Sequence, residues 1–269
     1  MFKIQVFAEN LRTRTMGMKP VHLPEVGSTS DWIAERLSTH GVERLVAVAE
    51  RQTNGKGRGG REWVSPPFVN VAASVAWKMP GSVDPPGLVT IAAGVALAEC
   101  AREVCGVAAM IKYPNDLYVN GRKAGGILTE RKVCGADVWA VIGVGVNVNT
   151  EAWMFPEDIG ARATSLMIEA GRPVLREKLL ASFVNKLEER LDSLANSGLD
   201  GILERSRQLS CVLGHEVTAE DAGETVRGVA VDIDNSGALL VKTRDGVVRR
   251  IISGETSVCA QNIRLAVST

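Results

Sequence analysis

The pattern of hydrophobic and polar positions changes along the chain and predicts two kinds of structure. Up to about residue 209, apolar runs containing β-branched residues alternate with longer segments that have helical spacing. Beyond residue 210, short strand-like stretches follow one another closely, at 216–219, 225–233, 238–243 and 247–252. This change predicts one large domain of strands and helices, followed by a small β-barrel of about 60 residues.

The strand-like runs of the first part are short and mostly apolar. They cover 21–24, 45–49, 68–77, 109–113 and 138–142. Asn120-Gly121 separates two further runs, 117–119 and 123–129, and Asn-Gly is the strongest short hairpin signal. We therefore expect a β-hairpin over 117–129.

Three segments carry helical signals. Ser28 with Asp31 three positions later resembles a capping box and predicts a helix through about residue 38. A small-residue helix is expected over 88–104, opened by Asp84-Pro-Pro86. The stripe of apolar residues in 174–196 predicts a long amphipathic helix that Gly198 ends. Residues 1–19 are treated as an N-terminal extension, in which the alternation over 2–7 indicates an arm or a first strand.

Composition excludes several classes of protein. The 269 residues carry 31 basic and 31 acidic side chains, so the chain lacks the basic excess of a dedicated nucleic-acid binder. Five scattered cysteines without a CxxC pair are typical of reduced thiols, and three histidines show no metal-binding spacing. The longest apolar stretch, 88–98, is too short to span a bilayer, and the N-terminus has no signal-peptide pattern. We expect a cytoplasmic protein without a membrane partner.

Residues 50–63 form the most distinctive stretch, in which four glycines (55, 57, 59 and 60) alternate with Lys56, Arg58 and Arg61. A mobile cationic loop of this composition suits a phosphate, although a solvated surface loop has the same features. The string Gly-x-Gly-x-x-Gly matches the dinucleotide fingerprint, but the prolines at 66 and 67 argue against the helix that the fingerprint requires. An RNA-binding tail would repeat the Arg-Gly-Gly element, which occurs once here.

Two further stretches combine polar side chains with glycines. Asn115 and Asp116 lie in a turn between strands, Lys123 follows the hairpin, and Gly143-Val-Gly-Val-Asn147 ends a strand. Glycine inside a strand suggests close approach of a ligand. Asn and Asp are also ordinary turn residues, and a single lysine is commonly a surface residue, so each type alone leaves a structural role open.

Taken together, these stretches resemble biotin protein ligases, the biotin–[acetyl-CoA-carboxylase] ligase family. The matching motifs are Gly-Lys-Gly-Arg-Gly-Gly-Arg at 55–61, Lys-Tyr-Pro-Asn-Asp at 112–116, Arg-Lys-Ala-Gly-Gly-Ile at 122–127 and Gly-Val-Gly-Val-Asn at 143–147, with a weaker match at 27–29. The resemblance implies a catalytic domain at 20–209 of the α/β (α+β) class, a mixed sheet with flanking helices like that of class II aminoacyl-tRNA synthetases. It also implies an SH3-like β-barrel at 210–269.

The resemblance further implies the chemistry and the residues that perform it. Biotin would react with ATP, accompanied by Mg²⁺, to give biotinyl-5′-AMP, from which biotin passes to a lysine of a biotin carboxyl carrier protein or domain. Catalysis is assigned to Lys123, Arg58 and Asp116, and no residue is assigned as a metal ligand. Biotin contacts are assigned to Ser28, Thr29, Gln52, Gly55, Lys56, Arg58, Lys123, Gly126 and Gly143. Nucleotide contacts are assigned to Arg58, Arg61, Trp63, Asn115 and Asn147.

Departures and alternatives accompany this interpretation. Many family members carry Trp where this chain has Tyr113, a mild change at a packing position. We find no N-terminal winged helix, so neither a repressor role nor a nucleic-acid partner is expected, whereas a homodimer is compatible with the family. The alternatives are a lipoate or octanoyl ligase with the same adenylate chemistry, and a non-enzymatic RNA-binding module that uses the Arg-Gly-Gly loop.

Overall fold

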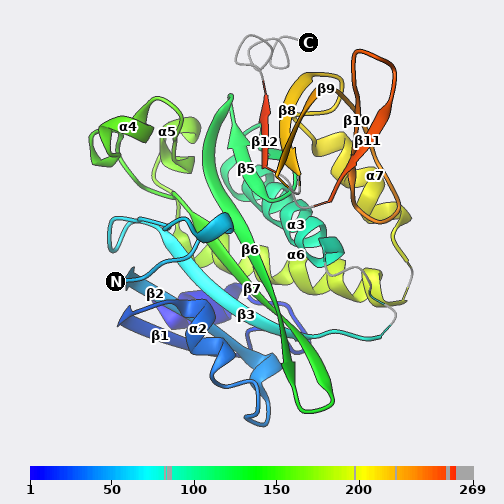
Figure 1. The fold of residues 1–269 in the computed structure, drawn as a ribbon. Helices are drawn as coiled ribbons and strands as arrows, with labels where there is room; N and C mark the ends of the chain where they lie inside the picture. The colour runs from blue at the N-terminus through cyan, green and yellow to red at the C-terminus, as the bar shows by residue number, and fades with distance from the viewer. Residues whose placement is uncertain (82, 84–86, 197, 222, 253–254, 259–269) are drawn as a thin grey trace.

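A mixed seven-stranded sheet forms the centre of the molecule, in the order β1-β2-β3-β7-β6-β5-β4 (Figure 1). The computed structural model describes residues 1–81, 83, 87–196, 198–221, 223–252 and 255–258. β1 and β2 are parallel, and the other neighbouring strands pair antiparallel. The strands are β1 (Lys19–Val26), β2 (Leu45–Gln52), β3 (Val71–Lys78), β4 (Met110–Lys112), β5 (Asp116–Val119), β6 (Arg122–Cys134) and β7 (Asp137–Val146).

Helices cover both faces of this sheet. The two longest, α3 and α6, pack on one face, and α2 packs on the other. Strands between two covered faces read as nearly continuous apolar runs, which explains the composition of β2, β3 and β7. The helices are α1 (Ile4–Asn10), α2 (Thr29–Ala34), α3 (Gly87–Cys105), α4 (Glu157–Gly160), α5 (Leu166–Ala170), α6 (Arg176–Asn196) and α7 (Asp200–Leu209), with 3₁₀ turns η1 (Val42–Arg44), η2 (Arg58–Gly60) and η3 (Ala152–Met154).

The stripe of apolar residues predicted for the long helix is buried as expected. It comprises Leu180, Val184, Leu187, Leu191 and Leu194. The hairpin predicted at Asn120-Gly121 is also present, between β5 and β6. The predicted opening of α3 at 84–86 lies outside the described residues.

The prediction of a first strand over 2–7 is wrong, because residues 4–10 form the helix α1. Phe7 is fully buried there, and α1 lies against α6. The apolar residues of 2–7 therefore serve a helix that packs on another helix, and so short an alternation could not distinguish this from a strand.

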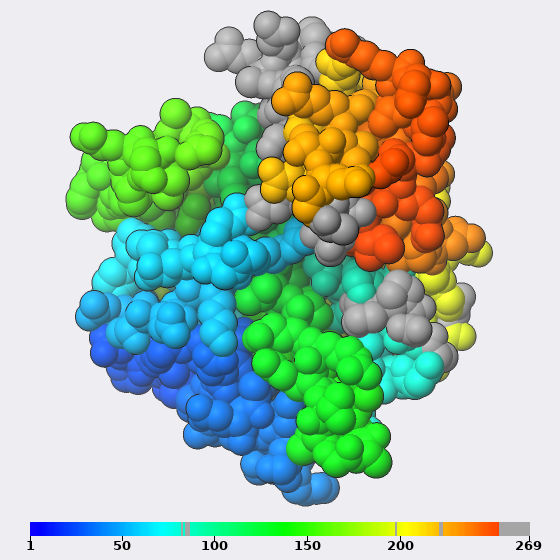
Figure 2. Space-filling view, in the orientation of Figure 1, coloured from blue at the N-terminus to red at the C-terminus, as the bar shows by residue number. Residues whose placement is uncertain are grey.

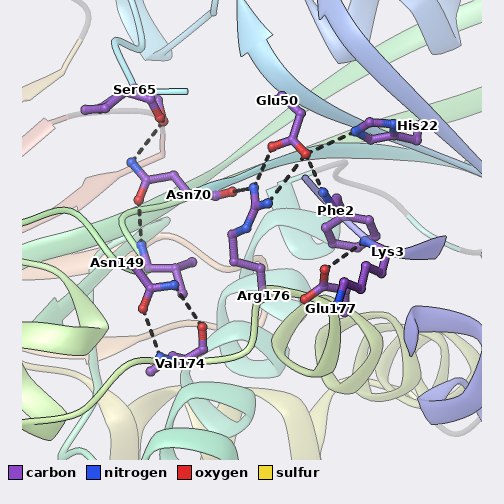
Figure 3. A network of polar contacts seen from close by, with 12 residues as sticks. Phe2, Lys3, His22, Glu50, Ser65, Asn70, Asn149, Val174, Arg176 and Glu177 are labelled. Carbon is purple, nitrogen blue, oxygen red and sulfur yellow. Dashed lines mark hydrogen bonds and ion pairs between the residues drawn. The ribbon is translucent and has the colours of Figure 1, made fainter. Parts of the chain in front are cut away.

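A buried ion pair ties the N-terminal segment to the sheet (Figure 3). Arg176 of α6 donates to Glu50 at 2.8 Å and to the carbonyl of Asn70 at 3.0 Å. Glu50 also accepts from the backbone N–H of Phe2 and lies 3.1 Å from His22 Nε2. Burial would raise the pKa of Glu50, but the hydrogen bonds from Arg176 and from Phe2 outweigh it and hold that pKa below its usual value.

The C-terminal part forms a five-stranded antiparallel sheet, an SH3-like barrel as predicted. Its order is β11-β10-β9-β8-β12. The strands are β8 (Glu216–Asp221), β9 (Glu224–Ile233), β10 (Leu239–Lys242), β11 (Val248–Ile251) and β12 (Glu255–Val258). Figure 2 shows this barrel in orange and red on one side of the upper face, with the light-green segment near residue 160 on the other side. The cyan stretch that follows residue 60 crosses below them.

Candidate active site

A cleft of about 710 Å³ opens between α2, the loop after β2, the β5–β6 hairpin and the segment 154–163. Every site residue predicted from the sequence lines this cleft except Gly55. Gly55 lies behind it, where a Cβ would overlap the carbonyl of Trp63. The three sequence stretches that carried the prediction therefore meet in one place, although they are separated along the chain.

One end of the cleft is a cluster of buried hydroxyls around the start of α2. The side chain of Gln52 accepts from the backbone N–H of Thr29 at 2.8 Å and from its hydroxyl at 3.0 Å. That hydroxyl lies 2.8 Å from Ser74 Oγ, which lies 3.0 Å from Ser30 Oγ. Ser28 caps the helix, accepting from the N–H of Asp31 at 3.5 Å. This end can recognise a small polar group that offers both donors and acceptors.

Ser30 and Ser74 were not among the predicted site residues. Ser74 is 1% exposed on β3, where Val71 and Val75 face α3 and α6 while Ser74 faces α2. A lone hydroxyl within an otherwise apolar strand was the signal that could have identified it, because alternate residues of a strand face opposite sides.

Glycines on β7 let groups approach the backbone of the sheet. A Cβ on Gly143 would lie 2.7 Å from Ser30 Oγ, and one on Gly145 would lie 2.7 Å from Cε2 of Trp63. The indole of Trp63 therefore rests directly on β7, and its Nε1 is buried without a hydrogen-bond partner in the described part of the chain. Only glycine permits this packing at position 145.

The other end of the cleft is charged. Lys123 Nζ lies 2.7 Å from Asp116 Oδ1, and the two side chains are 34% and 20% exposed. Arg58 donates to Asn115 Oδ1 at 3.0 Å, while Asn115 Nδ2 donates to the carbonyl of Ile127 at 2.7 Å. Cations held next to a cleft in this way can stabilise negative charge that develops on a phosphate.

The cationic loop, residues 55–61, is also held from its other side. Lys56 Nζ lies 2.5 Å from Asp31 Oδ1 of α2, and this hydrogen bond raises the pKa of Lys56. Arg61 Nε donates to the carbonyl of Arg58 at 3.1 Å. The loop therefore joins the hydroxyl end of the cleft, through α2, to its charged end, through Asn115.

The segment 152–163 closes another side of the cleft and was not predicted as part of the site. Met154, Phe155 and Ile159 line the cleft, and Trp153 beside them is 75% exposed. Backbone hydrogen bonds from Lys123 N to the carbonyl of Arg162 and from Thr164 N to the carbonyl of Lys123, each 2.9 Å, hold this segment against the β5–β6 hairpin. These residues show no regular apolar period, and for that reason no helix or strand was predicted for them.

Comparisons with known proteins identify the family of this chain. The Biotin/lipoate A/B protein ligase family matches residues 26–147, and the Biotin protein ligase C terminal domain matches residues 212–258. The bifunctional ligase/repressor BirA of Bacillus subtilis is 30% identical, covering 91% of this chain and 75% of the relative. The chain belongs to the biotin protein ligase family. A biotin–[acetyl-CoA-carboxylase] ligase of Mycobacterium tuberculosis is 32% identical, covering 80% of each chain.

Solved structures of biotin protein ligases share the fold. The enzyme from Aquifex aeolicus, solved in complex with biotin and ATP, is 27% identical with a TM-score of 0.78, covering 90% of this chain and 98% of that one. The expected ligase architecture, a mixed α/β catalytic domain with a C-terminal SH3-like barrel, is therefore confirmed. Within the described ranges, no helix of this ligase is long and apolar enough to cross a bilayer.

Proposed function

We propose that this protein activates biotin with ATP to form biotinyl-5′-AMP and transfers the biotinyl group to a lysine of a carrier protein or domain. The observation that carries the proposal is the meeting, in one cleft, of a buried hydroxyl cluster with the Lys123–Asp116 pair and Arg58. Membership of the ligase family and the biotin and ATP complex of the Aquifex aeolicus relative support the same assignment.

In the first half-reaction, a carboxylate oxygen of biotin attacks the α-phosphorus of ATP. The bond to the bridging oxygen breaks, and pyrophosphate leaves. The ureido group of biotin suits the hydroxyls of Thr29 and Ser28 and the amide of Gln52, which offer both donors and acceptors. Lys123, as a compact point charge, would bridge the attacking carboxylate and the phosphate, and Arg58 would hold the phosphate oxygens.

In the second half-reaction, the amine of the carrier lysine attacks the acyl carbon, and the bond to AMP breaks. An ammonium group must lose a proton before it can attack, and Asp116 lies where it can accept that proton once Lys123 has turned to the phosphate. The cationic loop would also exclude water, because an acyl-adenylate is easily hydrolysed.

Mg²⁺ is expected to arrive with ATP and to neutralise charge on the phosphates. Among the described residues, no group of three or more His, Cys, Asp or Glu side chains could hold a metal by itself. Mg²⁺ commonly keeps several waters and binds through substrate phosphates and one or two carboxylates, and Asp116 and Asp158 both line the cleft. The residues present therefore fit a metal that enters with the nucleotide.

The test is biotin-dependent exchange between ATP and labelled pyrophosphate, which reports adenylate formation alone. Lys123→Ala should lower the exchange rate roughly 100-fold or more, because it removes a preorganised cation from the transition state. Lys78→Ala is the matched control, since Lys78 forms a similar pair with Asp137 at 2.8 Å outside the cleft. No biotin-dependent exchange in the parent protein would refute the function, and normal exchange in Lys123→Ala would refute the role of Lys123.

The two alternative functions are less well supported. The first family match includes lipoate ligases, but the match at 212–258 is to a domain of biotin protein ligases. Arg58 is turned into the cleft towards Asn115 and is not part of a repeated, solvent-facing tail. Replacing biotin by lipoate or octanoate in the exchange assay separates the first alternative from the proposed function.

A further inference from the structure

Tyr113, which lines the cleft at the start of the turn before β5, is in direct contact with the barrel. Tyr113 is 5% exposed, and its hydroxyl lies 2.8 Å from the carbonyl oxygen of Gly237 and 3.1 Å from that of Ile251. A third carbonyl, that of Ile252, lies at 3.4 Å. The hydroxyl therefore donates into a group of backbone acceptors that all belong to the barrel.

The residues directly after Tyr113 make the contacts of the charged end. Asn115 accepts from Arg58, and Asp116 pairs with Lys123, as described above. Within four consecutive residues, the chain thus contacts the barrel, the cationic loop and the lysine assigned to adenylation. A displacement of this turn would move Asn115 directly and would shift Asp116, because Asp116 follows the turn as the first residue of β5.

Among the residues that the structure describes, the hydroxyl end of the cleft is held without contacts to the barrel. Thr29, Gln52 and Ser74 lie on α2, β2 and β3, and their side chains are hydrogen-bonded to one another and to Ser30. β2 and β3 lie towards one end of the strand order and β4 and β5 at the other end, and α2 packs over β2 and β3 (Figure 1). A change at the barrel contact should therefore affect the two ends of the cleft differently.

We propose that Tyr113 is a positioning residue through which the barrel fixes the turn that carries Asn115 and leads into Asp116, the first residue of β5. This inference rests on the proposed function, because it concerns the adenylation step. The hydroxyl sets the position of the turn and takes no part in the reaction. The role requires the phenol oxygen, which a residue serving only to fill space would not need.

Other contacts keep the barrel docked when that hydroxyl is removed. Arg207 of α7 donates to Asp232 and to the carbonyl of Ile233, each at 2.6 Å. Cys211 donates its backbone N–H to the carbonyl of Ile111 at 3.0 Å. Tyr113→Phe therefore keeps the barrel in place and the aromatic ring buried, while releasing the turn from the three carbonyls.

The experiment separates turnover from biotin binding. We expect Tyr113→Phe to lower kcat for biotin-dependent pyrophosphate exchange about 2- to 12-fold, the value of one neutral hydrogen bond, with the biotin Kd from calorimetry unchanged. The control is Thr13→Val, which removes a hydroxyl that donates to the carbonyl of Met16 at 2.6 Å, far from the cleft. Thr13→Val should lower the melting temperature about as much as Tyr113→Phe does, and it should leave kcat unchanged.

A second variant perturbs the same contact from the barrel side. The carboxylate of Asp234 accepts from the N–H groups of Ser236 and Ala238 at 2.8 and 3.0 Å, and so shapes the turn that presents the carbonyl of Gly237. Asp234→Ala should also lower kcat without changing the biotin Kd. Because both changes disrupt one contact, the double variant should lose little more than the larger single loss.

Three results would overturn the proposal. They are an unchanged kcat in Tyr113→Phe, a parallel loss of kcat and biotin affinity that follows the melting temperature, and a double variant whose loss is the product of the two single losses. A parent protein without exchange activity would instead refute the proposed function, so the two failures are distinguishable.

Discussion

Replacing Arg176 by Met should be strongly destabilising, although it roughly keeps the size of the buried side chain. The side chains of Glu50 and Arg176 are 1% and 7% exposed, and their closest contact is 2.8 Å. Arg176→Met leaves the Glu50 carboxylate with Phe2 and His22 as its remaining partners in the described part of the chain, and removes a donor from the carbonyl of Asn70. Breaking a buried pair from one side costs about 3–5 kcal/mol, because the remaining charge stays buried.

This cost can be read as a shift in melting temperature. One kcal/mol corresponds to about 2–4 °C in a chain of 150–250 residues, so a loss of roughly 6–20 °C is expected. The matched control is Arg51→Met, the same substitution in an exposed pair with Glu25 at 3.0 Å. Since exposed pairs contribute about 0–1 kcal/mol, the control should remain close to the parent.

The penalty should also depend on pH, because the pKa of Glu50 is lowered in the folded protein. A carboxyl with a lowered pKa stabilises the fold above its unfolded value of about 4.3, and that contribution is lost as the pH falls through the folded value. The difference between the parent and Arg176→Met, measured by urea unfolding, should therefore be largest near neutral pH and narrow in acid. If the free energies of unfolding of Arg176→Met and Arg51→Met differ by less than about 1 kcal/mol at neutral pH, this account of the Arg176–Glu50 pair is refuted.

Three further predictions concern the cleft. The Arg58→Gly variant should still make some biotinyl-AMP but release it roughly 10- to 150-fold faster, because it loses about one charged hydrogen bond to the phosphate. An avidin blot should then detect biotin on added albumin; unlabelled albumin together with normal retention of biotinyl-AMP would contradict this. Biotin and ATP together should suppress trypsin cleavage after Lys56 or Arg61, because their contacts would order the loop and offset the entropy cost of fixing its four glycines. Equal cleavage with and without the two ligands would argue against this. Gly145→Ala should raise the KM for ATP more than the Kd for biotin, because its Cβ would lie 2.7 Å from the ring of Trp63, which is assigned to the adenine site. A larger effect on the Kd for biotin would contradict that assignment of Trp63.

The sequence predicted best those elements whose signals are local. The Asn120-Gly121 turn, the stripe of α6 and the closely spaced strands of the barrel each depend on neighbouring residues, and the structure has all three. The helix over 200–209 was not predicted, although Ile202, Leu203 and Leu209 are buried in it. This helix has few apolar positions, and they define a buried face only once the surfaces against which they pack are known.

Contacts between distant segments could not be predicted in the same way. The hydroxyl of Tyr113 lies near carbonyls more than a hundred positions away along the chain. Every residue type has a backbone carbonyl, so the sequence does not show which carbonyl will accept a hydrogen bond. The sequence therefore indicated a packing position, which is correct for the ring and silent about the phenol oxygen. The pairing of Asp31 with Lys56 was equally unpredictable, because both residues already had local explanations as a capping residue and a loop charge.

The position of α1 has a consequence for how fragments of this protein should be cut. The family match begins at residue 26, yet Phe2, Phe7 and Met16 are each no more than 4% exposed and belong to the same core as α6. A fragment that starts at the boundary of the match would expose the apolar surface of α6 and would be expected to aggregate. The boundary of the family match therefore does not mark a folding unit, and we expect a stable fragment to need residues 2–18 as well. Fusion partners are better joined at Met1, which is 78% exposed.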